Sequence, residues 1–286
     1  MNPDPQALAP GLYFVATPIG AARDITLRAL DILRAADVIA AEDTRSLRKL
    51  MEIHGVPLGG RRIVAYHDHS DAAARERLVA AVRDGQSVAY ASEAGMPLVA
   101  DPGFQLGRAV AAAGGSVSVA PGASAPLAAL AISGLPSDAF LFAGFLPSAA
   151  GARRARLAEL AQVPATLIFF ESPKRVATML ADAAEVLGAG REAALCREIT
   201  KKFEQVLRAP LGDLAASLRE TPVKGEIVVL IGRGGSAKIR ESDVEEDLRT
   251  ALAEMSMRDA ADLVARAHDL PRREVYQLAL KLGKGG

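Results

Sequence analysis

The chain has 286 residues, half of them hydrophobic, and its 34 basic residues balance 34 acidic ones. A neutral chain lacks the general basic coat of a nucleic-acid-binding domain, whose pI is above about 9. The single cysteine, Cys196, excludes an internal disulfide and a cysteine-rich metal site. The sequence shows neither a signal peptide nor a window of about 18 apolar residues, so we expect a soluble cytoplasmic protein of about two domains.

Strands and helices are expected to alternate through the first half. Short apolar runs predict strands at 12–16, 38–41, 63–66, 88–91 and 117–120. Apolar residues at helical spacing predict a helix after Asp24, which can cap it, and further helices over 44–54, 71–84, 103–113 and 127–132. This alternation favours a mostly parallel sheet with helices on both faces.

A long loop, 92–103, follows the strand at 88–91 and contains two prolines, two glycines and two carboxylates. Loops from a strand to a helix usually have about 2–6 residues, and open α/β sheets bind ligands beyond the carboxyl ends of their strands. Glycine lets the backbone approach a ligand, and proline reduces the entropy lost on binding. The loop therefore predicts a ligand site; the alternative is an ordinary connection.

The second half repeats the alternation and then changes character. Strands are predicted at 140–145, 166–170, 193–196, 203–207 and 226–231, and helices at 151–162, 174–187 and 210–219. Residues 232–236 have the composition of a flexible linker. We therefore expect a flexible tail at 1–10, a first domain at 11–121, a second at 122–235 and a helical extension at 236–286.

Three short helices are predicted in the extension. Ser242 and Glu245 form a capping box for the first, Ser256 can cap the second, and the third starts at Arg272 after a tight connection at 268–271. Two short helices joined by a tight turn resemble a helix-turn-helix, and basic residues outnumber acidic ones around the third helix. The alternative is a small helical packing module.

Other strand ends carry polar motifs but no nucleotide-binding signature. The sequence contains neither GxxxxGK[ST] nor GxGxxG, which argues against a P-loop and a nicotinamide site. Asp43 and Arg45 follow the second strand, where they are either functional or a surface ion pair worth under about 1 kcal/mol. His67 and His69 alone are a weak metal signal, so we expect no metal.

Three basic clusters in the second half are candidates for contacts with phosphate groups. They comprise Arg153 and Arg154 near a helix start, Lys174 and Arg175 after a strand, and Lys202 in a charged strip. The alternative for each is a solvated helix face. Their concentration in one part of a neutral chain favours an anionic polymer as partner.

Together, these motifs resemble the bacterial 16S rRNA (cytidine-2′-O)-methyltransferases, within the tetrapyrrole-methylase-like class. The matching segments, in one order along about 11–231, are 12–20, 41–45, 67–69, 92–103, 121–122, 134–138, 144–147, 170–172, 197–201 with Glu204, and 224–226. The extension is also similar to a helix-turn-helix-like element of that family. Glu93 stands where the family usually has Asp, and Met96 where it has Thr.

The resemblance implies two αβα domains with S-adenosyl-L-methionine in the cleft between them, and a homodimer that acts on 16S rRNA of the small ribosomal subunit. It implies that the following residues hold the methyl donor: Pro18, Glu93, Ala94, Gly95, Met96, Ser124, Ala125, Ser172 and Glu226. Two other readings stay open, a tetrapyrrole C-methyltransferase of the same fold and a DNA-binding regulator led by the extension.

Methyl transfer to a ribose 2′-hydroxyl needs a route for the hydroxyl proton. A positioned general base would accelerate transfer by about 10²–10⁴-fold. Candidates are Lys201, if burial or nearby cations lower its pKa, and the carboxylates Glu198 and Asp43. Arg45 would orient a phosphate. The alternative is that water accepts the proton without a side-chain base.

Overall fold

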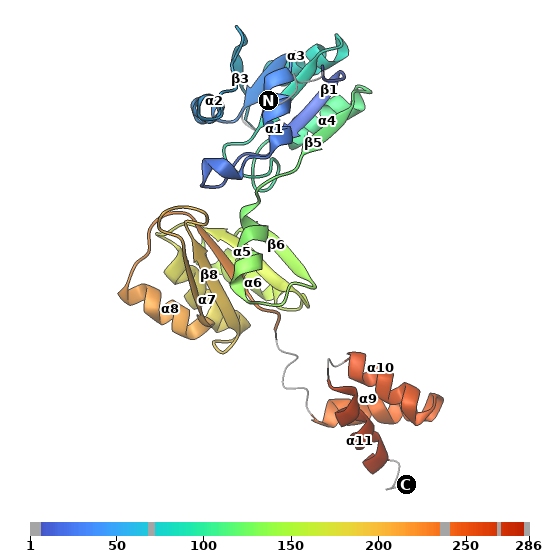
Figure 1. Ribbon diagram of the computed structural model, residues 1–286. Helices are drawn as coiled ribbons and strands as arrows, with labels where there is room; N and C mark the ends of the chain where they lie inside the picture. Colours follow the sequence, from blue (N-terminus) through green and yellow to red (C-terminus); the bar gives the residue numbers. More distant parts are fainter. Residues whose placement is uncertain (1–6, 68–71, 235–240, 268–269, 283–286) are drawn as a thin grey trace. The chain divides into compact units, whose positions relative to one another are not determined.

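The computed structural model describes residues 7–67, 72–234, 241–267 and 270–282 (Figure 1). The chain divides into two compact units, one built on two five-stranded sheets and one made of the C-terminal helices. We call the two halves of the larger unit the first and second lobe, each named after its sheet.

The first lobe contains a parallel sheet in the order β3-β2-β4-β1-β5. Its strands are β1 (Gly11–Val15), β2 (Val38–Ala41), β3 (Ile63–Ala65), β4 (Ser87–Ala91) and β5 (Val117–Ala120). Every residue of the central strand β4 is buried, as expected for a strand covered on both faces. The predicted parallel sheet is confirmed.

Helices cover both faces of this sheet. They are α1 (Leu27–Ala35), α2 (Thr44–Ile53), α3 (Ala72–Arg83) and α4 (Phe104–Ala112). One core cluster packs α1 and α2 against the sheet, and another packs α3 and α4 against it. The carboxyl ends of the strands, where parallel sheets bind ligands, remain open to loops.

The start of α1 differs from the prediction. The Thr26 hydroxyl accepts a hydrogen bond of 3.1 Å from the backbone N–H of Ala29 and caps the helix. Asp24 instead ends a short 3₁₀ helix, η1 (Ala22–Asp24), two residues before that cap. Threonine and aspartate are both favoured N-cap residues, so composition alone did not distinguish them.

The second lobe has a mixed sheet in the order β6-β7-β10-β8-β9. Its strands are β6 (Phe140–Phe145), β7 (Thr166–Glu171), β8 (Glu192–Arg197), β9 (Gln205–Pro210) and β10 (Ile227–Ile231). Only β6 and β7 are parallel; β10 is antiparallel to β7 and β8, and β8 is antiparallel to β9. The loop between β8 and β9 is too short for a parallel crossover, which needs about a dozen residues.

The second sheet is also buried on both faces. Helix α5 (Ala125–Ser133) packs on one face, against β8 and β10. Helices α6 (Ala150–Leu160), α7 (Val176–Leu187) and α8 (Leu211–Glu220) pack side by side, α6 on α7 and α7 on α8. The chain therefore passes from the first sheet to the second between the end of β5 and the start of α5.

The smaller unit consists of α9 (Glu241–Glu254), α10 (Met257–Ala267) and α11 (Arg272–Leu282) around a core of their own. Ser256 caps α10, since its Oγ accepts from the Asp259 N–H at 3.3 Å and donates to the Asp259 carboxylate at 2.6 Å. Helix α9 begins at Glu241, so Ser242 lies inside its first turn and not before it. His268 and Asp269 of the predicted connection lie outside the described residues.

Candidate active site

A cavity of about 510 Å³ lies between the loops of the two lobes. The first lobe supplies Ile19 and the loop after β4, while the second supplies the start of α5, the end of β7 and the segments before β10 and after β8. Its lining residues are Ile19, Glu93, Ala94, Ala100, Asp101, Ala125, Phe145, Phe170, Glu171, Ser172, Pro173, Ile199, Gly225, Glu226, Ile227 and Val228. The long loop 92–103 therefore contributes to a cavity, as its composition predicts.

The first turn of this loop is tied to the end of β1. Thr17 and Gly95 exchange two backbone hydrogen bonds, each 3.0 Å long. The Thr17 hydroxyl also lies 3.3 Å from the carbonyl oxygen of Ser92, and the Ser92 hydroxyl donates to the Gly95 carbonyl at 2.7 Å. Gly95 has a φ of 81°, and a Cβ there would lie 3.1 Å from Ile19. These contacts hold Glu93 and Ala94 at the cavity wall.

The end of the loop is held in a strained conformation. Leu98 and Ala100 have φ values of 72° and 61°, which L residues adopt at a cost of about 1–3 kcal/mol each. Gly103 has a φ of 121° and sits against the rings of Tyr90 and Phe14, which a Cβ would approach to 3.0 and 3.2 Å. Packing behind Gly103 thereby fixes where Asp101 enters the cavity.

Five of the nine residues predicted to hold the donor line the cavity, namely Glu93, Ala94, Ala125, Ser172 and Glu226. The other four do not line the cavity: Pro18, Gly95, Met96 and Ser124. Three of them directly precede or follow a lining residue in the sequence, and Met96 follows Gly95. Gly95 is buried by its pairing with Thr17, so it supports the wall without forming it.

Two carboxylates of the wall were not predicted from the sequence. Asp101 belongs to the loop already singled out, and Glu171 directly follows the strand predicted at 166–170 and ends β7, so proximity to strand ends could have identified both. With Glu93 and Glu226 they give the cavity four acidic residues, whereas its lining includes no lysine or arginine. Burial, followed by the charges of Glu42 and Glu93, raises the pKa of Asp101 to about 7.

Glu171 is a buried carboxylate, only 3 % exposed. Its Oε1 accepts a hydrogen bond of 2.7 Å from the Ser172 N–H. Its Oε2 lies 3.2 Å from the Arg175 guanidinium but has no hydrogen-bond partner among the described residues. Arg175 itself donates to the Leu146 carbonyl at 2.7 Å, so it braces this wall and is not free for the phosphate contact that the sequence suggested.

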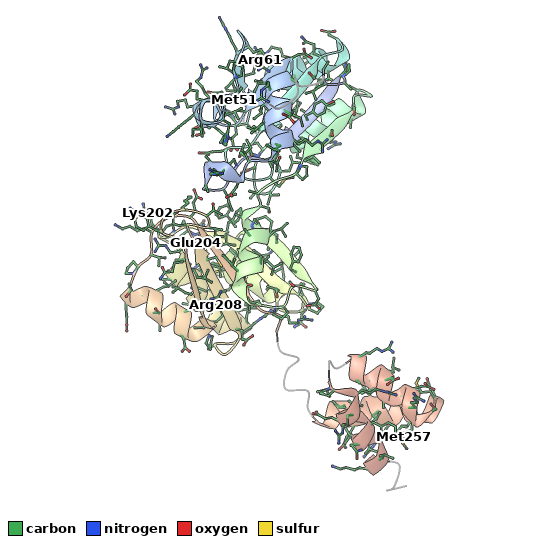
Figure 2. All side chains as sticks on the ribbon, in the orientation of Figure 1. Met51, Arg61, Lys202, Glu204, Arg208 and Met257 are labelled. Carbon is green, nitrogen blue, oxygen red and sulfur yellow. The ribbon has the colours of Figure 1, made fainter. Side chains whose placement is uncertain are left out.

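The charged strip after β8 joins the two lobes. The Ala21 N–H donates to the Thr200 hydroxyl at 3.0 Å, and a Cβ on Gly20 would lie 2.5 Å from the same oxygen. Glu198 and Thr200 adopt positive φ values of 51° and 63°. We call residues 197–204, together with their contact to Gly20 and Ala21, the clasp; Lys202 and Glu204 of this strip are labelled in Figure 2.

Lys201 is engaged by carboxylates within the clasp. Its Nζ lies 3.3 Å from Glu198 Oε1 and 2.9 Å from Glu226 Oε2. Burial alone would lower the pKa of Lys201, but hydrogen bonds and charges of Glu226 and Glu198 outweigh it and raise that pKa above its usual range. A hydrogen bond from the Glu226 N–H, with help from Lys201, lowers the pKa of Glu198 despite its partial burial. Neither shift favours a general base at neutral pH.

Asp43 caps α2 and does not line the cavity. Its Oδ1 accepts hydrogen bonds from the N–H groups of Arg45 at 2.7 Å and Ser46 at 3.1 Å. The bond from Ser46, and then that from Arg45, lower the pKa of the Asp43 carboxyl. This stabilised anion is a poor proton acceptor, whereas the Arg45 side chain remains exposed.

The structure contradicts the phosphate-binding role predicted for Arg153. Its side chain is buried and forms an ion pair of 2.5 Å with Asp182, because α6 packs this residue against α7. Arg154 is half exposed and shares Asp182 at 2.8 Å, with Glu185 at 3.0 Å. Lys174 and Lys202 are exposed, so Arg45, Lys174 and Lys202 remain the available cations of the predicted set.

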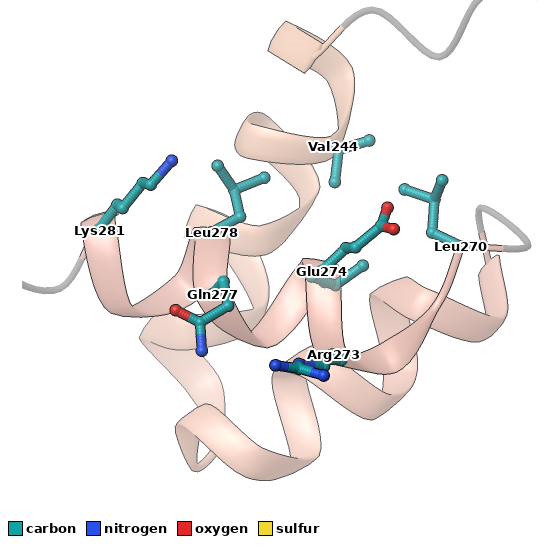
Figure 3. Close-up of a pocket in the computed structure, with 8 residues that line it drawn as sticks. Val244, Leu270, Arg273, Glu274, Gln277, Leu278 and Lys281 are labelled. Atoms are coloured by element: carbon teal, nitrogen blue, oxygen red, sulfur yellow. The ribbon is translucent and has the colours of Figure 1, made fainter.

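A second cavity, of about 710 Å³, lies within the helical extension (Figure 3). Val244, Leu270 and Leu278 provide apolar surface, while Arg273 and Lys281 on α11 provide exposed cations. No helix in the described ranges is long and apolar enough to span a membrane. Of the weak histidine pair, His69 lies outside the described residues.

Known proteins share this architecture. The sequence profile of the Tetrapyrrole (Corrin/Porphyrin) Methylases matches residues 11–215, and that of the RsmI C-terminal HTH domain matches residues 239–283. The fold resembles the methyltransferase CobJ, with a TM-score of 0.59 at 19% identity over 79% of this chain and 95% of that one. The class is thus a methyltransferase of the tetrapyrrole methylase fold, whose methyl donor is S-adenosylmethionine.

Closer relatives cover nearly the whole chain. The Ribosomal RNA small subunit methyltransferase I of Mesorhizobium japonicum is 48% identical over 96% of this chain and 93% of its own length. The protein of that name from Escherichia coli O157:H7 is 41% identical, with 94% of each chain covered. The chain belongs to the family of ribosomal RNA small subunit methyltransferase I.

The cavity fits S-adenosylmethionine in size and charge. Its volume lies within the roughly 300–1,000 Å³ of small-molecule sites. The carboxylates of Glu93 and Glu226 suit a ligand that carries a sulfonium and an ammonium group, and Glu171 Oε2, which has an ion pair but no hydrogen bond among the described residues, offers a buried acceptor. Ile19, Phe145 and Ile199 supply the apolar surface on which a flat adenine can lie.

Proposed function

We propose that this chain transfers a methyl group to the ribose 2′-oxygen of a cytidine in 16S rRNA, within the small ribosomal subunit. The acidic cavity between the lobes carries the proposal for the donor site, because a site lined by carboxylates favours a cationic ligand. The printed names of relatives up to 48% identical support rRNA of the small subunit as the substrate.

The protein's main contribution is orientation and exclusion of water. The sulfonium donor already carries an activated methyl group, so a chain that aligns it with the incoming oxygen removes much of the barrier. Glu93 and Ala94 from the first lobe and Ser172 and Glu226 from the second would hold the donor from opposite sides. The edge-on rings of Phe145 and Phe170, 5.6 Å apart, would keep that wall apolar.

The phosphate backbone of the RNA would be bound outside this cavity, since its acidic wall repels phosphate, while the reacting ribose reaches into it. The exposed cations Arg45, Lys174 and Lys202 are the proposed phosphate contacts, and Arg154 is a weaker candidate because two carboxylates already engage it. Arg273 and Lys281 in the helical extension would add to them. Contacts of this kind position the RNA without reading its sequence.

We further propose a homodimer in the cytoplasm. Phe104, Val117 and Val119 are exposed apolar side chains, the two valines lying on the edge strand β5. An exposed apolar strand edge is a ready site for a second chain. Light scattering that gives the mass of one chain at micromolar concentration would overturn the dimer.

The function is tested by incubating the protein with labelled S-adenosylmethionine and small subunits from a strain that lacks the modification. The expected product is 2′-O-methylcytidine in 16S rRNA, identified by mass after nuclease digestion. A methyl group on a base, or label accepted only by a tetrapyrrole, would overturn the proposal. Binding to duplex DNA with a steep salt dependence and no transfer would favour a regulator instead.

A further inference from the structure

Asp101 is a carboxylate of the cavity wall, carried by a loop whose conformation is fixed by packing. It lines the wall beside Ala100, and among the described residues no hydrogen bond or ion pair engages its carboxylate. The loop that carries it is locked by Gly103 against Tyr90 and Phe14. The Asp101 carboxylate is therefore held in position at the cavity wall before any ligand binds.

The charged groups around Asp101 and in the lining of its cavity are acidic. Glu42, after β2, and Glu93, after β4, act on it through their charges. The second lobe adds Glu171, which is paired with Arg175, and Glu226, which is paired with Lys201, to the lining of the same cavity. These cations are already neutralised by their own partners, so burial and negative charge raise the pKa of Asp101 to about 7.

None of the other candidate bases combines a position in the cavity wall with a pKa near neutral pH. Lys201 is protonated at neutral pH because its pKa is raised, and Asp43 and Glu198 are weakened as bases because theirs are lowered. A general base works best when its pKa lies near the operating pH. Asp101 meets that condition inside the cavity.

We propose that Asp101 is the proton acceptor for the ribose 2′-hydroxyl during methyl transfer. This inference rests on the function proposed above. The 2′-oxygen forms a bond to the methyl carbon while its O–H bond breaks, and the proton passes to the Asp101 carboxylate. The carbon–sulfur bond breaks with its electron pair going to sulfur, which leaves a neutral thioether. Asp101 then releases the proton to water.

The test compares wild-type protein with Asp101→Asn, Asp101→Glu and, as a control, Asp84→Asn, which removes an exposed carboxylate at the end of α3. Turnover on small subunits, donor affinity by calorimetry and the pH dependence of kcat/KM for the donor are measured for each. A carbon-13 titration of the carboxyl groups in the wild-type protein, without donor, measures the pKa of Asp101 directly.

Asp101→Asn is expected to lower kcat about 10²–10⁴-fold, the contribution typical of a general base, while donor affinity stays within about threefold. Wild-type kcat/KM should rise with pH and level off above about 7, following the ionisation of Asp101. Asp101→Asn should lose that dependence, Asp101→Glu should restore part of the rate, and Asp84→Asn should match wild type.

Different results separate the two proposals. If wild-type protein transfers no methyl group to rRNA, the proposed function fails and this inference fails with it. If wild-type protein is active and Asp101→Asn keeps its rate and pH profile, Asp101 is not the acceptor. A loss of donor binding in Asp101→Asn, or a carboxyl pKa near 4 in the titration, would overturn the inference equally.

Discussion

Two arginines on α6 share one buried carboxylate, Asp182 on α7. Arg153 pairs with it at 2.5 Å in the core, and Arg154 at 2.8 Å from the half-exposed side. In the sequence both arginines belong to a basic cluster near a helix start, a pattern that fits either a phosphate site or an internal ion pair. Only the packing of α6 on α7 reveals that one of the two holds the helices together.

Asp182→Asn should lower the free energy of unfolding by about 3 kcal/mol, because it leaves the Arg153 guanidinium buried without a counter-charge. Denaturant titration followed by circular dichroism measures the change. The control is Glu185→Gln, which removes the exposed partner of Arg154 and should alter stability by less than about 1 kcal/mol. Equal effects of the two variants would contradict the assigned role of the buried pair.

The stability lost in Asp182→Asn should also depend on pH. Burial opposes ionisation of Asp182, but hydrogen bonds and charges of Arg154 and Arg153 prevail and lower its pKa below the ordinary 3.8. A depressed carboxyl pKa stabilises the fold above that ordinary value, and the stabilisation is lost as pH falls through the folded-state pKa. The difference between wild type and variant should therefore be full at pH 7 and shrink below about pH 3.8. A constant difference would contradict this.

Among the elements, the clasp depends on a glycine that faces it from the other lobe. A Cβ on Gly20 would lie 2.5 Å from Thr200 Oγ1 and 2.8 Å from the Ile199 carbonyl oxygen, so the backbone of the clasp would have to move. Gly20→Ala should lower the free energy of unfolding by about 1–3 kcal/mol, as overpacking does. It should also weaken donor binding, because Ile19 and Ile199 line the cavity.

A matched glycine tests whether this effect is local. Gly151, in the first turn of α6, has open space where a Cβ would lie. Gly151→Ala should be neutral or stabilise the protein by about 0.5 kcal/mol, since alanine favours the helix, and donor binding should not change. Calorimetry and denaturant titration compare the two variants; similar donor affinity in both would argue against the clasp as a support of the cavity.

Most elements were predictable because the pattern of apolar residues is strong. The strands β2, β5 and β6 coincide with their predicted ranges, and other strand bounds shift by up to three residues. The direction of strands in the second sheet was not predictable from alternation. The short connection between β8 and β9 reverses the chain direction and makes these two strands antiparallel. Its charged residues show no periodic pattern from which this turn could be predicted.

At the scale of the whole molecule, the proposed donor cavity and the proposed RNA contacts carry opposite charge. The cavity is acidic, whereas exposed cations include Arg273 and Lys281 on α11 (Figure 3). A double variant, Arg273→Gln with Lys281→Gln, should weaken binding to small subunits and reduce the slope of log affinity against log salt by about 2. Donor affinity should stay unchanged.

Filter binding over a range of salt concentrations measures both quantities. The control is Arg219→Gln, which neutralises an exposed cation on α8, outside the proposed contacts. If the control weakens binding as much as the double variant, the effect is one of net charge and the helical extension has no special part. If neither variant changes the slope, these cations do not contact phosphate.

The site was predictable in outline and not in detail. Strand ends and the loop 92–103 indicated where the cavity lies, but Asp101 acquires its raised pKa only from burial and from Glu42 and Glu93, of which Glu42 is distant in sequence. For Lys201, the sequence allowed a lowered pKa and hence a role as a base. In the structure Glu226, from another segment, pairs with Lys201 and raises its pKa. Long-range charge pairing leaves no signal in a single sequence.

The central claim is that the methyl donor binds in the acidic cavity, and Ala94→Arg tests it most directly. Ala94 is exposed at the cavity wall, so an arginine there can fill the space and pair with the carboxylates without disturbing the core. The measurement is calorimetric titration of S-adenosylmethionine into this variant, with Ala112→Arg on α4 as control. We predict that wild type and control bind the donor and that Ala94→Arg does not. Unchanged binding by Ala94→Arg would contradict the account.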